Sequence, residues 1–242
     1  MRSFLKMISE IDITFNFYSD TPSGKDPDSF SPTLRAYHKA LWSKELSDGQ
    51  VFELSDKQKG SYLYHNSPIG EFHLNSDAIT HTYSSWKVMK HIISQLPSSE
   101  IEEFYHIGST IGAYLIFPGN KVNGKMTING SRGTNRHIKD RFDLTLECIR
   151  RYYSNDNSPL KETLDRYPKF FGLFNNFEEY VDFFLLQDLV AKDYSGIKFW
   201  LKFEDFGNSP LPRNIEEYKC YKESVINFVR ARNLRIEESC QT

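Results

Sequence analysis

The spacing of hydrophobic residues predicts a small antiparallel sheet in the first half of the chain. Residues 11–18 place isoleucine or phenylalanine at every second position, which is typical of a strand with one buried face. Three shorter segments, 51–54, 62–65 and 70–74, have the composition of extended chain between turn residues. We therefore expect these segments to form strands of a small sheet.

A second group of strands is predicted around the most apolar run of the chain. Residues 110–117 read TIGAYLIF, which indicates a central strand. Asn123-Gly124 is a dipeptide favoured in two-residue hairpin turns, so residues 125–128 are expected to pair back on that strand. Residues 197–203 alternate apolar and polar side chains and predict one further strand.

Helical spacing covers most of the remaining chain. Ser31 and Pro32 supply an N-cap and a first-turn proline for a helix that ends near Trp42. Ser99 and Glu102 have the spacing of a capping box, which indicates another helix start. Apolar residues three and four positions apart predict further helices over residues 85–96, 99–108, 136–153, 160–167, 170–174, 178–190 and 215–237.

These elements predict an α+β fold. The strands lie mainly before residue 130 and the helices mainly after it, so we expect a single domain with a small antiparallel sheet and a largely helical C-terminal half. A division near residue 130 into a sheet-rich part and a helical part is the alternative. A chain of 242 residues is long enough for either arrangement.

Composition limits the class of protein. The chain has 30 basic and 32 acidic side chains and a net charge of −2, so any basic site must be local. Cys148, Cys220 and Cys240 lack metal-binding spacing and are expected to be reduced thiols without a disulfide partner. The sequence contains neither a secretory signal nor 18 consecutive apolar residues, so we expect a soluble cytoplasmic protein without a membrane partner.

Four segments resemble a family of bacterial proteins of unknown function. They are KDPDSFSPTLRAYHKALWSKEL, TINGSRG, DRFDLTLECIRRYY and VDFFLLQDLV, and the resemblance extends over most of the chain, from Ile13 to Phe228. It implies no activity, cofactor or catalytic residue, because none is established for that family. Function must therefore be inferred from the residues themselves.

The main candidate for a site is the basic loop at residues 129–137, which is expected to lead from a strand into a helix. Gly130 would let the backbone approach a ligand, and free N–H groups at the helix N-terminus would bind an anion. Arginines in this loop would add charge-assisted contacts to phosphate oxygens. We therefore predict a nucleotide, dinucleotide or RNA ligand, bound by Asn129, Ser131, Arg132, Gly133 and Arg136.

Three side chains are candidates for acid–base chemistry. His65 ends a predicted strand, and Asp140 and Asp143 follow the basic loop. Asp140, Asp143 and Glu147 share a helix face, and carboxylates at this spacing can bind a divalent metal. Arginines interleaved with them favour a solvated face of ion pairs instead, such as Arg136 with Asp140 and Glu147 with Arg151, so no metal site is assigned.

Two weaker patterns accompany this site. Arg132 and His137 have an R-x4-H spacing similar to that of HEPN-type ribonucleases, in which the pair acts on a ribose 2′-hydroxyl without a metal. That spacing is common by chance, and no four-helix pattern accompanies it here. Asp26 and Asp28 form a second carboxylate cluster, but Asp and Pro are also ordinary turn residues.

Two functional classes remain open. In the first, the protein is an enzyme acting on a phosphate-containing ligand. In the second, it is a non-catalytic binding or interaction protein, and the same arginines form a structural ion-pair network. Arg132 distinguishes the two, because a free arginine in a cleft favours the enzyme and a fully paired one favours the alternative. The sequence identifies no cofactor and does not fix the oligomeric state.

Asp188 gives a separate test of the helix over residues 178–190. A carboxylate in so apolar a segment is costly to bury without a partner. We therefore expect Asp188 to bond an arginine, a lysine or a helix N-terminus, or to point into solvent.

Overall fold

A three-stranded antiparallel sheet lies at the centre of the computed structural model, which describes residues 11–241. Its strands are β3 (Leu63–Ser67), β4 (Gly70–Ala78) and β5 (Tyr114–Pro118), and β4 lies between the other two. Cα partners along the sheet include Leu63 with Leu74, and Leu74 with Pro118. Every residue of β5 is buried, so this strand is covered on both faces.

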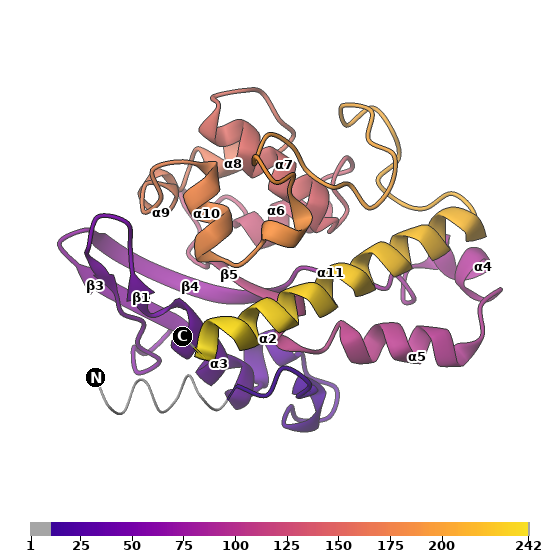
Figure 1. The fold of residues 1–242 in the computed structure, drawn as a ribbon, viewed down its shortest axis with the longest axis horizontal. Coiled ribbons are helices and arrows are strands. Elements are labelled where there is room, and N and C mark those ends of the chain that lie inside the picture. The colour runs from indigo at the N-terminus through magenta and orange to yellow at the C-terminus, as the bar shows by residue number, and fades with distance from the viewer. Residues whose placement is uncertain (1–10, 242) are drawn as a thin grey trace.

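Helices lie on both sides of this sheet. In the view of Figure 1, α6 to α10 lie above the strands, α2 and α3 lie below them, and α5 lies below α11 at the right. The helices are α2 (Pro27–Phe30), α3 (Pro32–Trp42), α4 (Lys90–Ile93), α5 (Ser98–Ile107), α6 (Ile128–Thr134), α7 (Phe142–Tyr153), α8 (Lys161–Leu164), α9 (Pro168–Phe171), α10 (Phe177–Phe183) and α11 (Ile215–Gln241). Short 3₁₀ turns are η1 (Phe17–Ser19), η2 (Lys87–Met89), η3 (Ile111–Ala113) and η4 (Gln187–Leu189), and a second small sheet pairs β1 (Lys44–Glu45) with β2 (Val51–Phe52). The fold is therefore α+β, as the sequence predicted.

The long helix α11 is joined to the rest of the molecule by a buried cation. Arg232 is fully buried and donates to the carbonyl oxygens of Gly112, Tyr114 and Phe184 at 2.8 to 3.0 Å. Gly112 lies so close to α11 that a Cβ on it would stand 2.6 Å from the Val229 carbonyl oxygen. These contacts fix α11 against η3 and β5. None of the helices in the described part of the chain is both long and apolar enough to cross a membrane.

Several sequence predictions are confirmed. Ser31 caps α3, because its Oγ accepts from the Leu34 N–H at 3.1 Å, and the helix ends at Trp42. The segments at 62–65 and 70–74 lie in β3 and β4, which pair as a hairpin. The last helix begins at Ile215, and Arg235 binds both carboxylate oxygens of Asp188 at 2.9 Å.

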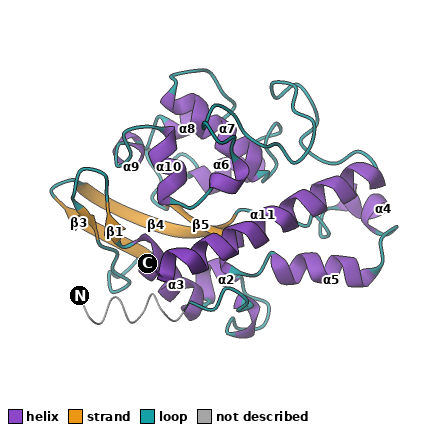
Figure 2. Cartoon of the chain, in the orientation of Figure 1, coloured by secondary structure: helices purple, strands orange, loops and turns teal. Residues whose placement is uncertain are grey.

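Two predicted strands are absent. Residues 11–18 contain a turn and η1, although Phe17 is buried and the apolar positions do face the core. Residues 197–203 make one isolated bridge, between Val190 and Ile197, and Figure 2 draws this part of the chain as loop. In both segments the alternation reflects which side chains face the core, but no neighbouring strand supplies the hydrogen bonds of a sheet.

The predicted hairpin after Asn123-Gly124 is also wrong. The turn exists, with positive φ at both residues and a hydrogen bond from Lys125 N to Val122 O. The chain then enters α6 rather than a strand, because Thr127 caps that helix and Ile128 packs into the core. Residues 129–137 are therefore mostly helical, not a loop, and α7 begins only at Phe142.

Other helices differ in length. The segment 85–96 forms only η2 and α4, and α5 begins after Pro97 without the predicted capping box at Ser99. The helix predicted over 178–190 ends at Phe183, and Leu185 then adopts a positive φ of 55°. Apolar side chains on most sides of this segment are buried in either conformation, so hydrophobicity alone did not show the break.

Candidate functional site

Two adjoining pockets share Asp26 and Asp28, and together we call them the acid cleft. The first has a volume of about 370 Å³ and the second of about 420 Å³. The first pocket is lined chiefly by acids and aromatics, including Tyr18, Asp77, His81, Tyr105, Tyr114 and Asp140. The second is lined chiefly by neutral polar groups and one cation, including Arg35, Tyr62, Asn75, Ser76 and Asn129.

The short helix α2 places Asp28 between the two pockets. Pro27 at the first helical position begins α2, which packs on β4. The Asp28 carboxyl accepts from Ser76 Oγ and from the Ala78 N–H, both on β4 and both at 3.4 Å. These are long contacts from neutral donors, so they stabilise a negative charge on Asp28 only weakly.

This environment raises the pKa of Asp28 to about 7. Burial is the largest cause, followed by the nearby carboxylates of Asp77 and Asp26. Asp28 is therefore present in both its protonated and its ionised form near neutral pH.

Asp77, next to Asp28 in the cleft, has a cationic partner. Its carboxylate binds the guanidinium of Arg132, which is fully buried. Burial raises the pKa of Asp77 to about 6 even with Arg132 beside it, so the pair is ionised at neutral pH. Arg132 also donates to the carbonyl oxygens of Ala78 and Asp140, at 3.1 and 3.0 Å. All of these partners are protein groups, which is the arrangement expected of a structural ion-pair network.

The other predicted ligand-binding residues are dispersed. Ser131 is buried and accepts from Thr163 Oγ1 at 3.1 Å, and Gly133 lies within α6 against the Asp140 carboxylate. Arg136 is exposed and donates to His137 Nε2 at 2.9 Å. Asn129 lines the second pocket of the acid cleft. The structure thus brings Asn129 to the cleft and leaves the other four residues outside its lining.

The predicted acid–base residues are also separated. Asp140 lines the first pocket. Asp143 is fully buried in a pair with Arg141 and accepts from the Trp200 N–H at 3.0 Å. His65 is buried between Glu53 O and Ser67 Oγ, at 2.7 and 2.9 Å. Asp143 and His65 therefore have structural partners away from the cleft.

Residues 11–241 show no arrangement that matches the metal site or the R-x4-H pair considered from the sequence. Glu147 is buried and pairs with Arg150 and Arg151, at 2.8 and 2.7 Å, apart from Asp140 and Asp143. Of the two ion pairs that the sequence predicted, Glu147 with Arg151 is confirmed, whereas Arg136 makes no ion pair with Asp140 and donates to His137 instead. Across residues 11–241 no group of three or more His, Cys, Asp or Glu side chains is arranged to bind a metal ion. His137 binds Arg136 and the Phe206 carbonyl and does not share a hydrogen bond with Arg132.

Sequence reasoning missed the residues that define the cleft. Asp26 and Asp28 lie in an Asp-Pro-Asp sequence that is also common in turns, and no sequence motif marks His81 among the seven histidines of the chain. The His81 Nδ1 accepts from the Tyr83 N–H at 2.8 Å, and burial lowers its pKa, so the ring is neutral with its proton on Nε2. The only available signal was the Asp-Pro-Asp sequence, because Asp77 and His81 approach it through the fold.

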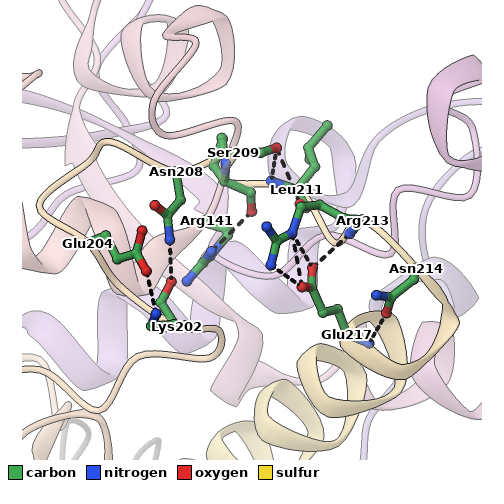
Figure 3. A network of polar contacts seen from close by, with 10 residues as sticks. Arg141, Lys202, Glu204, Asn208, Ser209, Leu211, Arg213, Asn214 and Glu217 are labelled. Atoms are coloured by element: carbon green, nitrogen blue, oxygen red, sulfur yellow. Dashed lines mark hydrogen bonds and ion pairs between the residues drawn. The ribbon is translucent and has the colours of Figure 1, made fainter.

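A third pocket, of about 380 Å³, lies beside a polar network around Arg141 (Figure 3). Arg141 donates to the Pro210 carbonyl at 3.1 Å and so connects α7 to the segment before α11. Its neighbours Lys202 and Arg213 are paired with Glu204 and Glu217. Because its cations are paired with protein acids, this pocket is a weaker candidate for a ligand site than the acid cleft.

Comparison with known proteins gives a family and no function. Residues 11–236 match the sequence profile described as "Family of unknown function (DUF6994)", so the chain belongs to that family. No curated protein and no solved structure matches the chain.

Proposed function

We propose that this member of a family of unknown function is an enzyme that acts on a small polar ligand in the acid cleft, with Asp28 as its general acid–base group. The observation that supports this most strongly is the environment of Asp28. Its carboxyl lies between two pockets and beside two other carboxylates, and its hydrogen bonds within residues 11–241 are long and come from neutral donors. Perturbed groups in clefts are concentrated at functional sites.

Other aspartates in the molecule show what a structural role looks like. Asp77, Asp143 and Asp188 are each held by an arginine, namely Arg132, Arg141 and Arg235. Among residues 11–241 no arginine is hydrogen-bonded to Asp28, which is instead destabilised by like charges. A carboxyl in this position lowers folding stability. A functional role therefore explains its presence better than a structural role does.

The cleft supplies the other features that proton transfer needs. A group with a pKa near the working pH donates and accepts protons with comparable ease, and such catalysis typically contributes about 10² to 10⁴ in rate. Asp28 would protonate or deprotonate the ligand, while the neutral His81 offers a hydrogen-bond donor at Nε2. The exposed rings of Tyr18 and Tyr105 offer flat surfaces in the lining of the first pocket.

A phosphate ligand at residues 129–137 has weaker support. Arg132 is buried and bonded to protein groups, which favours the structural role for this segment. The carboxylates of Asp26, Asp28, Asp77 and Asp140 would also repel a phosphate that entered the first pocket. The acid cleft therefore favours a neutral or cationic ligand.

The test is a comparison of wild type with Asp28→Asn, which preserves shape and removes the titrating group. Each protein is incubated with a mixture of small metabolites, and consumption is followed by mass spectrometry. Wild type should consume at least one compound, and Asp28→Asn should do so about 10² times more slowly or worse. Asp156→Asn, an exposed aspartate outside the cleft, is the matched control and should match wild type. Equal consumption by wild type and Asp28→Asn would exclude the proposed role.

A further inference from the structure

We propose that the first pocket of the acid cleft binds a small organic amine through its positively charged primary ammonium group. This inference rests on the proposed function, because it names the class of substrate that would lie against Asp28. The pocket carries negative charge that the protein does not compensate. Of its four carboxyl groups, that of Asp77 is paired with Arg132, whereas those of Asp26, Asp28 and Asp140 form no ion pair within residues 11–241.

Two hydroxyl groups point to a ligand independently of this charge. Tyr114 is only 3% exposed and Thr80 only 8%, and both line the first pocket. Within residues 11–241 neither Tyr114 Oη nor Thr80 Oγ1 has a hydrogen-bond partner, yet neither oxygen is sealed from solvent as the Tyr180 hydroxyl is. Because the rest of each side chain is covered, the accessible surface of these oxygens opens into the pocket. Polar groups so deeply placed are almost always hydrogen-bonded, so the two hydroxyls indicate a polar ligand that reaches them.

Tyr114 is the better defined of the two. It begins strand β5, and its ring meets the Phe17 ring edge-on, with centroids 5.5 Å apart. This packing holds the hydroxyl at a fixed place in the lining. Burial raises the pKa of Tyr114, and the negative charge of Asp28 raises it further, so the hydroxyl stays protonated. Such a hydroxyl can accept a hydrogen bond from an ammonium N–H and donate its own proton to a carboxylate.

The rest of the lining favours an amine over other ligands. An ammonium group has three N–H donors, and the carboxylates and hydroxyl oxygens of the pocket are acceptors for them. The rings of Tyr18 and Tyr105 are about half exposed, and the Tyr105 hydroxyl is hydrogen-bonded to Ser84. Their faces can contact both the carbon chain and the charge of an alkylammonium ion. A divalent metal ion is a poorer match, because no three His, Cys, Asp or Glu side chains of the described chain are arranged as its ligands.

The test is calorimetric titration of the full chain with putrescine and with agmatine at pH 7. The neutral comparison is 1,4-butanediol, which has hydroxyls in place of the two ammonium groups of putrescine. At least one amine should bind wild type, and butanediol should bind at least tenfold more weakly than that amine. Tyr114→Phe should weaken amine binding by about tenfold or more, as expected for the loss of one hydrogen bond to a charged group.

The control is Tyr180→Phe. Tyr180 also has a buried hydroxyl without a hydrogen-bond partner, but it does not line the acid cleft. Removing an unpartnered hydroxyl should leave both variants folded, so the comparison isolates the pocket. Tyr180→Phe should bind the amine as wild type does. Absence of binding by both amines, equal binding of butanediol, or equal affinity for wild type and Tyr114→Phe would overturn the amine site.

The outcome is separable from that of the proposed function. Asp28→Asn leaves the carboxylates of Asp26 and Asp140 in place and should still bind the amine, although more weakly. Amine binding that depends on Tyr114, with no consumption dependent on Asp28, would reject the catalytic role and keep the amine site. Consumption that depends on Asp28 but is limited to uncharged compounds and is unaffected by Tyr114→Phe would keep the catalytic role and reject the amine site.

Discussion

At the scale of single residues, the surroundings of a carboxyl decide whether it stabilises the fold or burdens it. Asp77, Asp143 and Asp28 are the same chemical group in one protein. Arg132 and Arg141 compensate the charges of the first two. Asp28 meets neutral donors and other acids instead, and its pKa rises from 3.8 to about 7. This difference predicts a specific pH dependence of stability.

Asp28 should make the wild type less stable as the pH rises from about 4 to about 7. In that range the folded state keeps the Asp28 proton more tightly than the unfolded state does, so deprotonation favours unfolding. One unit of pKa shift corresponds to about 1.4 kcal/mol. Because Asp28 is partly exposed, solvent screening reduces the total effect of the shift, and we expect a loss of about 2 kcal/mol in the free energy of unfolding. Asp28→Asn should therefore be more stable than wild type at pH 8, by about that amount.

Urea unfolding of both proteins between pH 4 and pH 8 measures this difference. It should be small at pH 4, where Asp28 is protonated in the folded state and only about half ionised in the unfolded state, and should approach its plateau by pH 8. The difference between the two proteins cancels the titration of the other acids, to the extent that they are independent. A difference that does not change with pH would contradict the assigned environment of Asp28.

Sequence spacing identified a specific ion-pair partner in one case, and that partner was local. Glu147 and Arg151 were correctly paired because they are four positions apart on one helix. The fold brings Arg132 on α6 to Asp77 on β4, and Asp28 on α2 to Ser76 on β4. Sequence spacing does not encode contacts between such distant positions. Of the predicted ligand-binding residues, Asn129 lies in the cleft, but it is placed there by helix α6 and not by the predicted loop.

At the scale of elements, the end signal at Ser31 predicted better than alternation did, although the capping box expected at Ser99 does not form. Ser31 and Pro32 located the start of α3 because the cap forms within the segment itself. Residues 11–18 and 197–203 have strand-like alternation but no neighbouring strand. The turn at Asn123-Gly124 formed, yet Thr127 began a helix three residues later. A strand depends on a partner elsewhere in the chain, whereas a helix cap does not.

The contact between η3 and α11 gives a prediction at this scale. A Cβ at residue 112 would stand 2.6 Å from both the Val229 carbonyl oxygen and Asn233 Oδ1, so Gly112→Ala must push η3 away from α11. It would also weaken the bond from the Gly112 N–H to Asn233 Oδ1, which is 2.7 Å long. We expect a loss of about 1–3 kcal/mol or more in the free energy of unfolding.

Gly196→Ala is the matched control for this substitution. No atom lies within 4 Å of the position of its added Cβ, and its φ is not in the left-handed region. That variant should be neutral, or more stable by up to about 1 kcal/mol, because alanine restricts the unfolded chain. Thermal unfolding of the two variants beside wild type tests the pair. Similar melting temperatures for the two variants would show that η3 and α11 are packed less tightly than described.

At the scale of the whole molecule, one buried cation connects parts of the chain on both sides of residue 130. Arg232 lies on α11, and its guanidinium binds carbonyl oxygens of Gly112 and Tyr114 before that point and of Phe184 after it. These partners are all neutral, so the bonds are lost together if α11 separates from the sheet. This connection offers a way to distinguish the single domain predicted from the sequence from the alternative division near residue 130.

We expect the chain to unfold as one cooperative unit. Arg232→Lys should lower the urea midpoint, because an ammonium group cannot reach three carbonyls in the planar arrangement of a guanidinium, and the loss should be about 3 kcal/mol. Tryptophan fluorescence and far-ultraviolet circular dichroism should report the same lowered midpoint, since Trp42 and Trp200 lie in parts of the core on opposite sides of residue 130. Arg230→Ala is the control, because Arg230 is exposed and pairs with Glu103 at the surface, and it should shift the midpoint little. If residues before and after 130 instead fold separately, the two signals will diverge in Arg232→Lys, with one transition shifted and the other left near its wild-type position.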